Sequence, residues 1–195
     1  MLQIGIALFP DAEELDWAGP WEVLAFWSAQ FPADEVTVRT VAGSLDPIHC
    51  AKGLRVLPDT TWDKLGPVDV LVFPGGKGTR PLVHDQPTLD RLRALHAGGT
   101  LMTSVCTGAL VYAAAGLLRD LPATTYWAAF DELLAIDPTI KADTESRFVD
   151  TGQVITAAGV SAGIDMALHL VARLHSTDRA REVRRGIQYD PEPPV

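Results

Sequence analysis

Three short apolar runs, the first two ended by a proline and the third by a cysteine, constrain the fold of this chain of 195 residues most strongly. They cover residues 3–9, 68–73 and 100–105. Apolar runs of this length are typical of strands buried on both faces of a parallel sheet. Helical spacing follows the runs, over 16–31, 87–97 and 108–115. Strands that alternate with helices predict an α/β fold, doubly wound around a mainly parallel sheet.

The remaining elements complete this pattern. Residues 35–41 predict a further strand, 54–57 an added edge strand, 146–150 and 153–157 a hairpin, 161–174 a last helix and 189–194 an extended tail. Pro20 is compatible with helix 16–31 because proline is tolerated in a first turn. We find no repeat, linker or low-complexity segment, so residues 1–195 are expected to form one domain.

Composition narrows the class of protein. The net charge of -9 and the lack of a basic stripe argue against a nucleic-acid partner. No run is long enough to span a membrane, and the N-terminal residues lack the pattern of a signal peptide. Two cysteines fit free thiols in a reducing cytosol, so a cytoplasmic location is expected. No metal-ligand spacing or phosphate loop is present, so we expect no metal and no cofactor.

The run 101–110 carries the clearest chemical signal. A buried strand stops at Cys106 and turns at once into a helix rich in small residues. Such a nucleophile elbow strains the backbone, exposes the side chain and directs the first helical amides at the reacting atom. A thiol at a helix N-terminus also has a lowered pKa. Cys106 is therefore a candidate nucleophile, the alternative being an inert core residue, whereas Cys50 has no such setting.

Two other features follow strand ends and converge on the same edge of the sheet. The Gly75-Gly76 turn allows close approach of a backbone amide, and the amides of Gly76 and Thr107 could form a two-donor anion hole. Asp16 precedes a helix, where an aspartate is commonly an N-cap. It is alternatively an acidic partner for the thiol.

A histidine base is the usual partner of a cysteine nucleophile. None of the five histidines stands beside a strand end that also carries a carboxylate. The residue after the cysteine is Thr107. A Cys-His-Asp triad is thus not supported.

The chain resembles the DJ-1/PfpI superfamily over essentially its whole length. The matching segments are 14–24, 73–76, 104–108, 123–127, 155–159 and 162–165. The helix entry with Asp16, combined with Thr107, resembles the isocyanide hydratase branch more narrowly. Members of that branch end in a tail similar to Tyr189-Asp190-Pro191-Glu192-Pro193-Pro194.

The resemblance implies a flavodoxin-like homodimer in which Cys106 is the nucleophile and Asp16 its acidic partner. It further implies hydration of a small isocyanide to an N-substituted formamide. Protease and glyoxalase-like members carry a histidine near the nucleophile, which Thr107 does not supply. AraC-type regulators carry a further helix-turn-helix region, which we do not find up to Val195, and glutamine amidotransferases need a late His-x-Glu pair.

Two alternatives remain from the residues. One is another cysteine enzyme on this scaffold, an amidase, a peptidase or a glyoxal-consuming lyase. The other is a non-catalytic redox sensor or ligand-binding module whose cysteine is oxidised. Aromatic residues could line an apolar substrate pocket or pack in the core or a dimer interface: Trp17, Trp21, Tyr126, Trp127 and Phe130.

Overall fold

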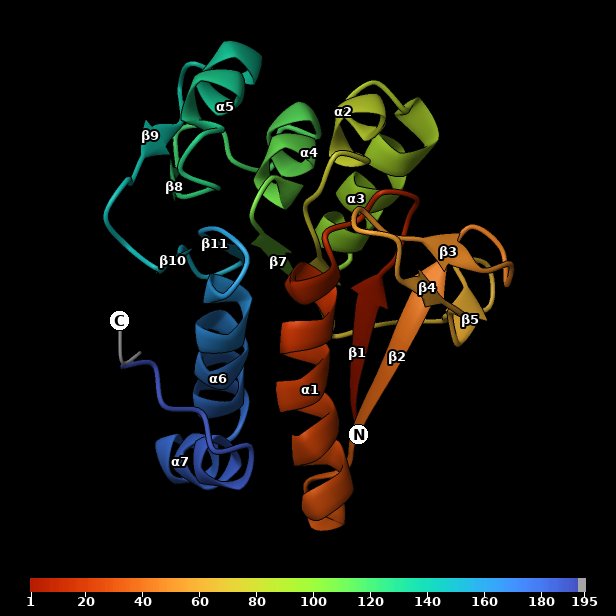
Figure 1. Cartoon of the computed structure of the whole chain (residues 1–195). Coiled ribbons are helices and arrows are strands. Elements are labelled where there is room, and N and C mark those ends of the chain that lie inside the picture. The colour runs from red at the N-terminus through yellow and green to blue at the C-terminus, as the bar shows by residue number, and fades with distance from the viewer. Residues whose placement is uncertain (193–195) are drawn as a thin grey trace.

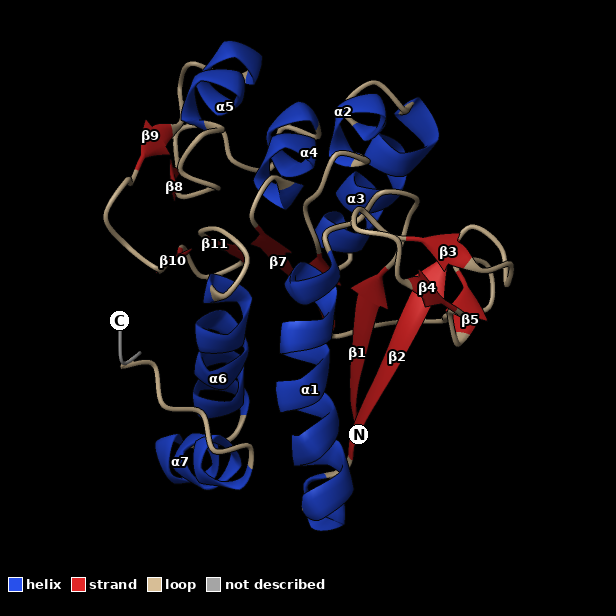
Figure 2. Cartoon of the chain, in the orientation of Figure 1, coloured by secondary structure: helices blue, strands red, loops and turns tan. Residues whose placement is uncertain are grey.

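The computed structural model describes residues 1–192 and is built around one seven-stranded sheet (Figures 1 and 2). Its strands are β1 (Leu2–Ala7), β2 (Val36–Ala42), β5 (Thr60–Thr61), β6 (Val70–Phe73), β7 (Leu101–Val105), β10 (Phe148–Asp150) and β11 (Val154–Ala157). Their order is β10-β11-β7-β6-β1-β2-β5, and only β10 runs antiparallel to its neighbour. The predicted mainly parallel sheet and the predicted hairpin are confirmed.

Seven α-helices accompany the sheet in the described residues: α1 (Glu14–Gln30), α2 (Thr79–Leu82), α3 (Gln86–Ala97), α4 (Gly108–Ala114), α5 (Phe130–Ile136), α6 (Ala162–Leu174) and α7 (Thr177–Gly186). From β1 the chain crosses to β2 on one side, whereas from β6 it crosses to β7 on the other. Because such crossovers are right-handed, α1 and α3 cover opposite faces, which is the doubly wound, flavodoxin-like arrangement. Helix α6 packs beside α1 and α7 against α6 (Figure 1). None of these helices is long and apolar enough to cross a membrane.

Two local predictions are wrong. Residues 54–57 do not extend the main sheet, because β4 (Arg55–Val56) pairs with β3 (Ile48–His49) in a separate hairpin (Figure 2). The sheet edge is formed by β5 instead. Pro20 is not in a first turn, since α1 already begins at Glu14. Of the predicted tail, residues 193–194 lie outside the described part of the chain.

Close packing of α1 on α6 explains how Pro20 is accommodated. Pro20 is buried inside α1 and faces Gly163 of α6. A Cβ atom on Gly163 would lie 3.1 Å from Pro20 Cγ, so a larger residue there would require Pro20 to shift. The glycine therefore allows a ring that breaks the hydrogen-bond ladder of α1 to be covered by a neighbouring helix.

A short connecting segment, residues 11–13, fixes the start of α1. On one side the Asp11 amide donates to His49 O at 2.9 Å, and Ala12 O accepts from the Ala51 amide at 2.9 Å. On the other side the Glu13 amide donates to Gly75 O at 2.9 Å. The entry to α1 is thus held between the β3–β4 hairpin and the turn after β6.

Candidate active site

Cys106 lies at a sharp turn between β7 and α4, as the sequence predicts. Its φ of 56° is in the left-handed region, which is strained for a residue other than glycine. The surroundings enforce this conformation. The Cys106 amide donates to the carbonyls of both Ala157 and Ala158 at 3.0 Å, and its own carbonyl accepts from Thr125 Oγ1 at 2.8 Å. The expected exposure of the side chain is not found, because Cys106 is largely buried, with 6% of its surface exposed.

Asp16 is not the N-cap of α1. The cap position is Glu13, and Asp16 lies in the first helical turn with its side chain fully buried. Its Oδ2 accepts a hydrogen bond from the Gly75 amide at 2.8 Å. Its Oδ1 has no hydrogen-bond partner among the described residues. The Cys106 thiol acts on the carboxyl group as a hydrogen-bonding neighbour. The acid on α1 and the sulfur that follows β7 therefore lie close together.

Burial changes the acidity of Asp16. Removal from water raises its pKa from 3.8 to about 7, and the negative charge of Glu13 acts in the same direction. The Gly75 amide, the Cys106 thiol and Lys52 favour the ionised form and lower the pKa. Near neutral pH the carboxyl group is thus divided between its protonated and ionised forms.

The expectation of a lowered pKa for Cys106 is wrong for the resting thiol. Burial, then the charge of Asp16, raises the pKa of Cys106 to about 12, although the amides of Thr107 and Val160 act against this. Protonation of Asp16 removes the second of these two causes, so the thiolate forms more readily when Asp16 carries the proton.

Gly75 and Gly76 hold this arrangement together in different ways. A Cβ atom on Gly75 would lie 2.5 Å from Thr107 N and 2.8 Å from Asp16 Oδ2, so only glycine fits between them. Gly76 has a φ of 114°. Its amide donates to Thr107 Oγ1 at 2.9 Å, so the predicted pairing of the Gly76 and Thr107 amides as free donors is not formed. Gly76 instead orients the Thr107 side chain.

Val160 is a site residue that the sequence analysis missed. It follows β11, in the loop that leads into α6, and its amide donates to the sulfur of Cys106. Its φ of 45° is in the left-handed region. The matching segment 155–159 ended one residue earlier, and nothing in a valine side chain indicates a backbone donor. Only the position after a strand end could have suggested it.

The histidines and most of the aromatic candidates lie apart from Cys106 and Asp16. The groups that shift the pKa of Cys106 include no histidine; His169 and His175 pair with Asp150 and Asp34 instead. Trp17 and Trp21 line a separate surface cavity of about 450 Å³. Trp127 is largely exposed and packs against Tyr126, and Phe130 packs partly buried against the core. Within residues 1–192, no group of three or more His, Cys, Asp or Glu side chains could hold a metal ion.

The family model of the DJ-1/PfpI family matches residues 3–173. The chain belongs to the DJ-1/PfpI family. It is 42% identical over 194 residues to the isonitrile hydratase of Pseudomonas putida, in an alignment that covers 99% of this chain and 81% of that protein. This confirms the resemblance on which the sequence analysis relied.

Solved structures agree with this assignment. The crystal structure of a ThiJ/PfpI family protein from Pseudomonas syringae superposes with a TM-score of 0.88 at 33% identity, covering 100% of this chain and 77% of that one. Drosophila melanogaster DJ-1beta superposes with a TM-score of 0.86 at 23% identity, covering 97% and 98% of the two chains. The second likeness concerns the fold alone.

Proposed function

We propose that the protein is an isocyanide hydratase, a lyase that adds water to an isocyanide and releases an N-substituted formamide. The observation that carries this proposal is the buried contact between Cys106 and Asp16, with no histidine acting on the thiol. The similarity to the Pseudomonas putida isonitrile hydratase supports the same reaction. A small-molecule isocyanide is then the substrate.

In the first step the sulfur of Cys106 attacks the terminal carbon of R–NC. That carbon is electrophilic toward a soft thiolate, and a new S–C bond forms. The thiol proton passes to Asp16, whose pKa of about 7 allows it to accept and return a proton near neutrality. Asp16 then delivers this proton to the attacked carbon. The product of the step is a thioimidate, R–N=CH–S, bound to Cys106.

In the second step a water molecule adds to the thioimidate carbon. Asp16, ionised after the first step, takes one proton from the water and passes it to the nitrogen. Collapse of the R–NH–CH(OH)–S adduct breaks the S–C bond and releases R–NH–CHO, and the hydroxyl proton of the adduct passes to Asp16. The thiolate recovers the proton held by Asp16. One water is consumed and both side chains return to their starting states.

The backbone amides support the charged states of this cycle. Those of Thr107 and Val160 donate to the sulfur and stabilise the thiolate before attack and on departure. The Thr107 hydroxyl, held by the Gly76 amide and 3.2 Å from Thr79 Oγ1, is a candidate contact for the substrate. Gly76 and Thr107 thus form the proposed substrate-binding side of the site.

Replacement of Cys106 by alanine tests the proposal directly. The variant removes the proposed nucleophilic sulfur, and turnover of p-nitrophenyl isocyanide should fall to background. Cys50→Ala is the matched control, because Cys50 is the other buried free cysteine and lies in the β3–β4 region. Retained turnover in Cys106→Ala, or no turnover in the wild type, contradicts the proposal.

The same proposal includes one domain, residues 1–195, acting as a homodimer in the cytoplasm. Large apolar side chains exposed near the start of α1 support a second copy as partner. Leu15 and Trp21 are about 40% exposed, and Leu57 beside Trp21 is 65% exposed. Light scattering at micromolar concentration should give twice the chain mass of 21.0 kDa. Trp21→Lys should give the monomer.

A further inference from the structure

The loop between β11 and α6, residues 158–161, determines where the Val160 amide points. Val160 is β-branched and has a positive φ, a combination that an isolated chain avoids. The conformation must therefore be imposed by contacts of the residues around it. The loop contacts the nucleophile directly, since Ala158 O accepts from the Cys106 amide at 3.0 Å. The Val160 amide also lowers the pKa of the thiol. Whatever fixes the loop therefore also acts on Cys106.

Arg147 forms hydrogen bonds with this loop at both of its ends. Its backbone carbonyl accepts from the Ala158 amide at 2.9 Å. Its guanidinium donates through Nη2 to Ser161 Oγ at 3.1 Å and through Nε to Asp165 Oδ2 at 2.8 Å. One residue thus holds the loop before Val160 by its backbone and after Val160 by its side chain.

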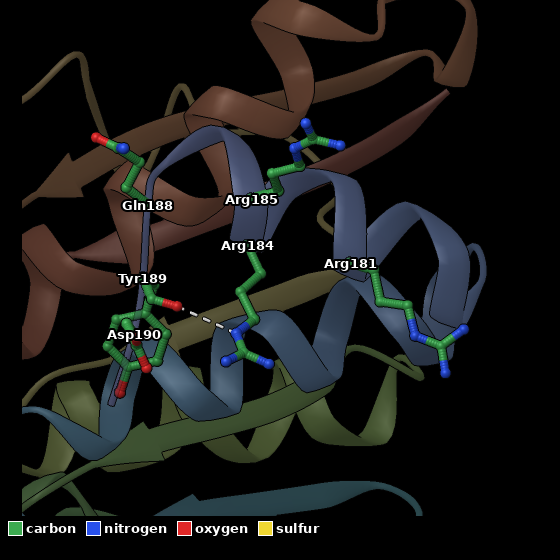
Figure 3. Close-up of a pocket in the computed structure, with 6 residues that line it drawn as sticks. All are labelled: Arg181, Arg184, Arg185, Gln188, Tyr189 and Asp190. Atoms are coloured by element: carbon green, nitrogen blue, oxygen red, sulfur yellow. Dashed lines mark hydrogen bonds between the residues drawn. The ribbon is translucent and has the colours of Figure 1, made fainter. Parts of the chain in front are cut away.

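Tyr189 completes the arrangement from the far end of the chain. Its hydroxyl donates to Asp165 Oδ1 at 2.9 Å, so both carboxylate oxygens of Asp165 are engaged. The backbone of Tyr189 is itself fixed on α7: its amide donates to Arg184 O at 3.1 Å, and its carbonyl accepts from Arg184 Nε at 3.1 Å (Figure 3). The neighbouring Arg181 and Arg185 point away from this contact in Figure 3. The tail is thus tied to α6 through one hydroxyl group.

We infer that Arg147, Asp165 and Tyr189 are positioning residues for the nucleophile, because together they fix the loop 158–161, whose Ala158 carbonyl binds the Cys106 amide. The inference rests on the proposed role of Cys106. None of the three touches the sulfur, so their effect is transmitted through the loop. The predicted extended tail therefore has a function in the site, although it lies outside the elements that form it.

The expected signature is a change in the pH dependence of Cys106. A well-directed amide stabilises the thiolate, and a misdirected one does not. The charged groups that act on the thiol or on its partner acid are Asp16 of α1, Glu13 before it and Lys52 of the hairpin region. All three remain in place when Tyr189 is changed. A shift is then attributable to the loop.

The test is alkylation of Cys106 by iodoacetamide in the full chain, followed by mass spectrometry of the Cys106 peptide between pH 6 and 11. Tyr189→Phe removes one oxygen atom. We expect the rate constant at pH 8 to fall about 3- to 10-fold and the rate–pH curve to move to higher pH, as loss of one hydrogen bond to a thiolate implies. Arg147→Ala should shift the curve further, and Arg147→Lys should restore part of the rate.

Arg173→Ala is the matched control. Arg173 also joins α6 to β10, through Asp150 at 2.7 Å, but at the opposite end of the helix from Val160. Its curve should coincide with the wild type. If Arg147→Ala does not fold, Tyr189→Phe decides the question alone.

The outcomes separate the two proposals. A Tyr189→Phe curve that matches the wild type, or an equal shift in Arg173→Ala, overturns the positioning role and leaves the proposed reaction untouched. A shifted curve in an enzyme that does not consume isocyanides overturns the reaction and supports the positioning role. A wild-type Cys106 that is not alkylated at any pH overturns both.

Discussion

Replacement of Asp16 by asparagine should make the protein more stable while removing its activity. Asparagine keeps the shape of the side chain and can still accept the Gly75 hydrogen bond, but it carries no charge. The folded protein raises the pKa of Asp16 from 3.8 to about 7. About three pH units correspond to roughly 4 kcal/mol of unfavourable free energy when the carboxylate is ionised in the folded state.

The sign of the pH dependence follows from proton binding. Between pH 3.8 and about 7 the folded state holds a proton that the unfolded state has lost, so wild-type stability falls as the pH rises through this range. The Asp16→Asn variant has no carboxyl group to ionise at this position, so its stability does not fall in this way. Its free energy of unfolding should exceed that of the wild type by up to about 4 kcal/mol at pH 8 and match it near pH 4.

Urea unfolding at a series of pH values measures the difference. Asp34→Asn is a control of opposite sign, since hydrogen bonds from Arg179 and Trp27 hold the pKa of Asp34 below its ordinary value. That variant should lose stability at pH 8 and lose less as the pH approaches 3. An Asp16→Asn variant no more stable than the wild type at pH 8, with the same pH slope, refutes the argument from burial.

Two further substitutions test the packing of the site and of its support. Gly75→Ala should lower kcat/KM for an isocyanide at least 100-fold, because its Cβ atom would displace Asp16 and Thr107; an unchanged kcat/KM would contradict the close fit. Tyr112→Phe should lower the free energy of unfolding by about 1 kcal/mol in urea titrations, since it removes the buried hydrogen bond to Thr103 O at 2.9 Å, and it should leave KM unchanged.

The sequence was a good guide to those parts of the fold that depend on apolar pattern and turn residues. The strands at 68–73 and 100–105 and the hairpin around Thr151-Gly152 were each found within about two residues. Helix α7 and the short helices α2 and α5 were not predicted as separate elements. Helices α2 and α5 have only four and seven residues, and α7 buries only Val183. The pairing of residues 54–57 failed since two adjacent short strands can satisfy each other locally instead of joining the sheet edge.

The site was predictable in its side chains and less so in its electrostatics. Cys106 and Asp16 could be singled out because each follows a buried strand. The direction of the pKa shift of Cys106 could not be predicted. It depends on how deeply the thiol is buried and on a carboxylate 90 residues earlier in the chain. Val160 was missed for a related reason: a backbone amide acts through its conformation, which side-chain identity does not reveal.

Because of the segment 11–13, Asp16 and Cys106 are held in place by different parts of the fold. Cys106 is anchored by the carbonyls of Ala157 and Ala158, whereas the start of the helix bearing Asp16 is suspended between the turn after β6 and an outlying hairpin. Lengthening or shortening that hairpin is therefore expected to displace Asp16 more than Cys106. A fold of this kind can adapt the position of its acid to a new electrophile through changes in the β3–β4 hairpin, which carries neither Asp16 nor Cys106.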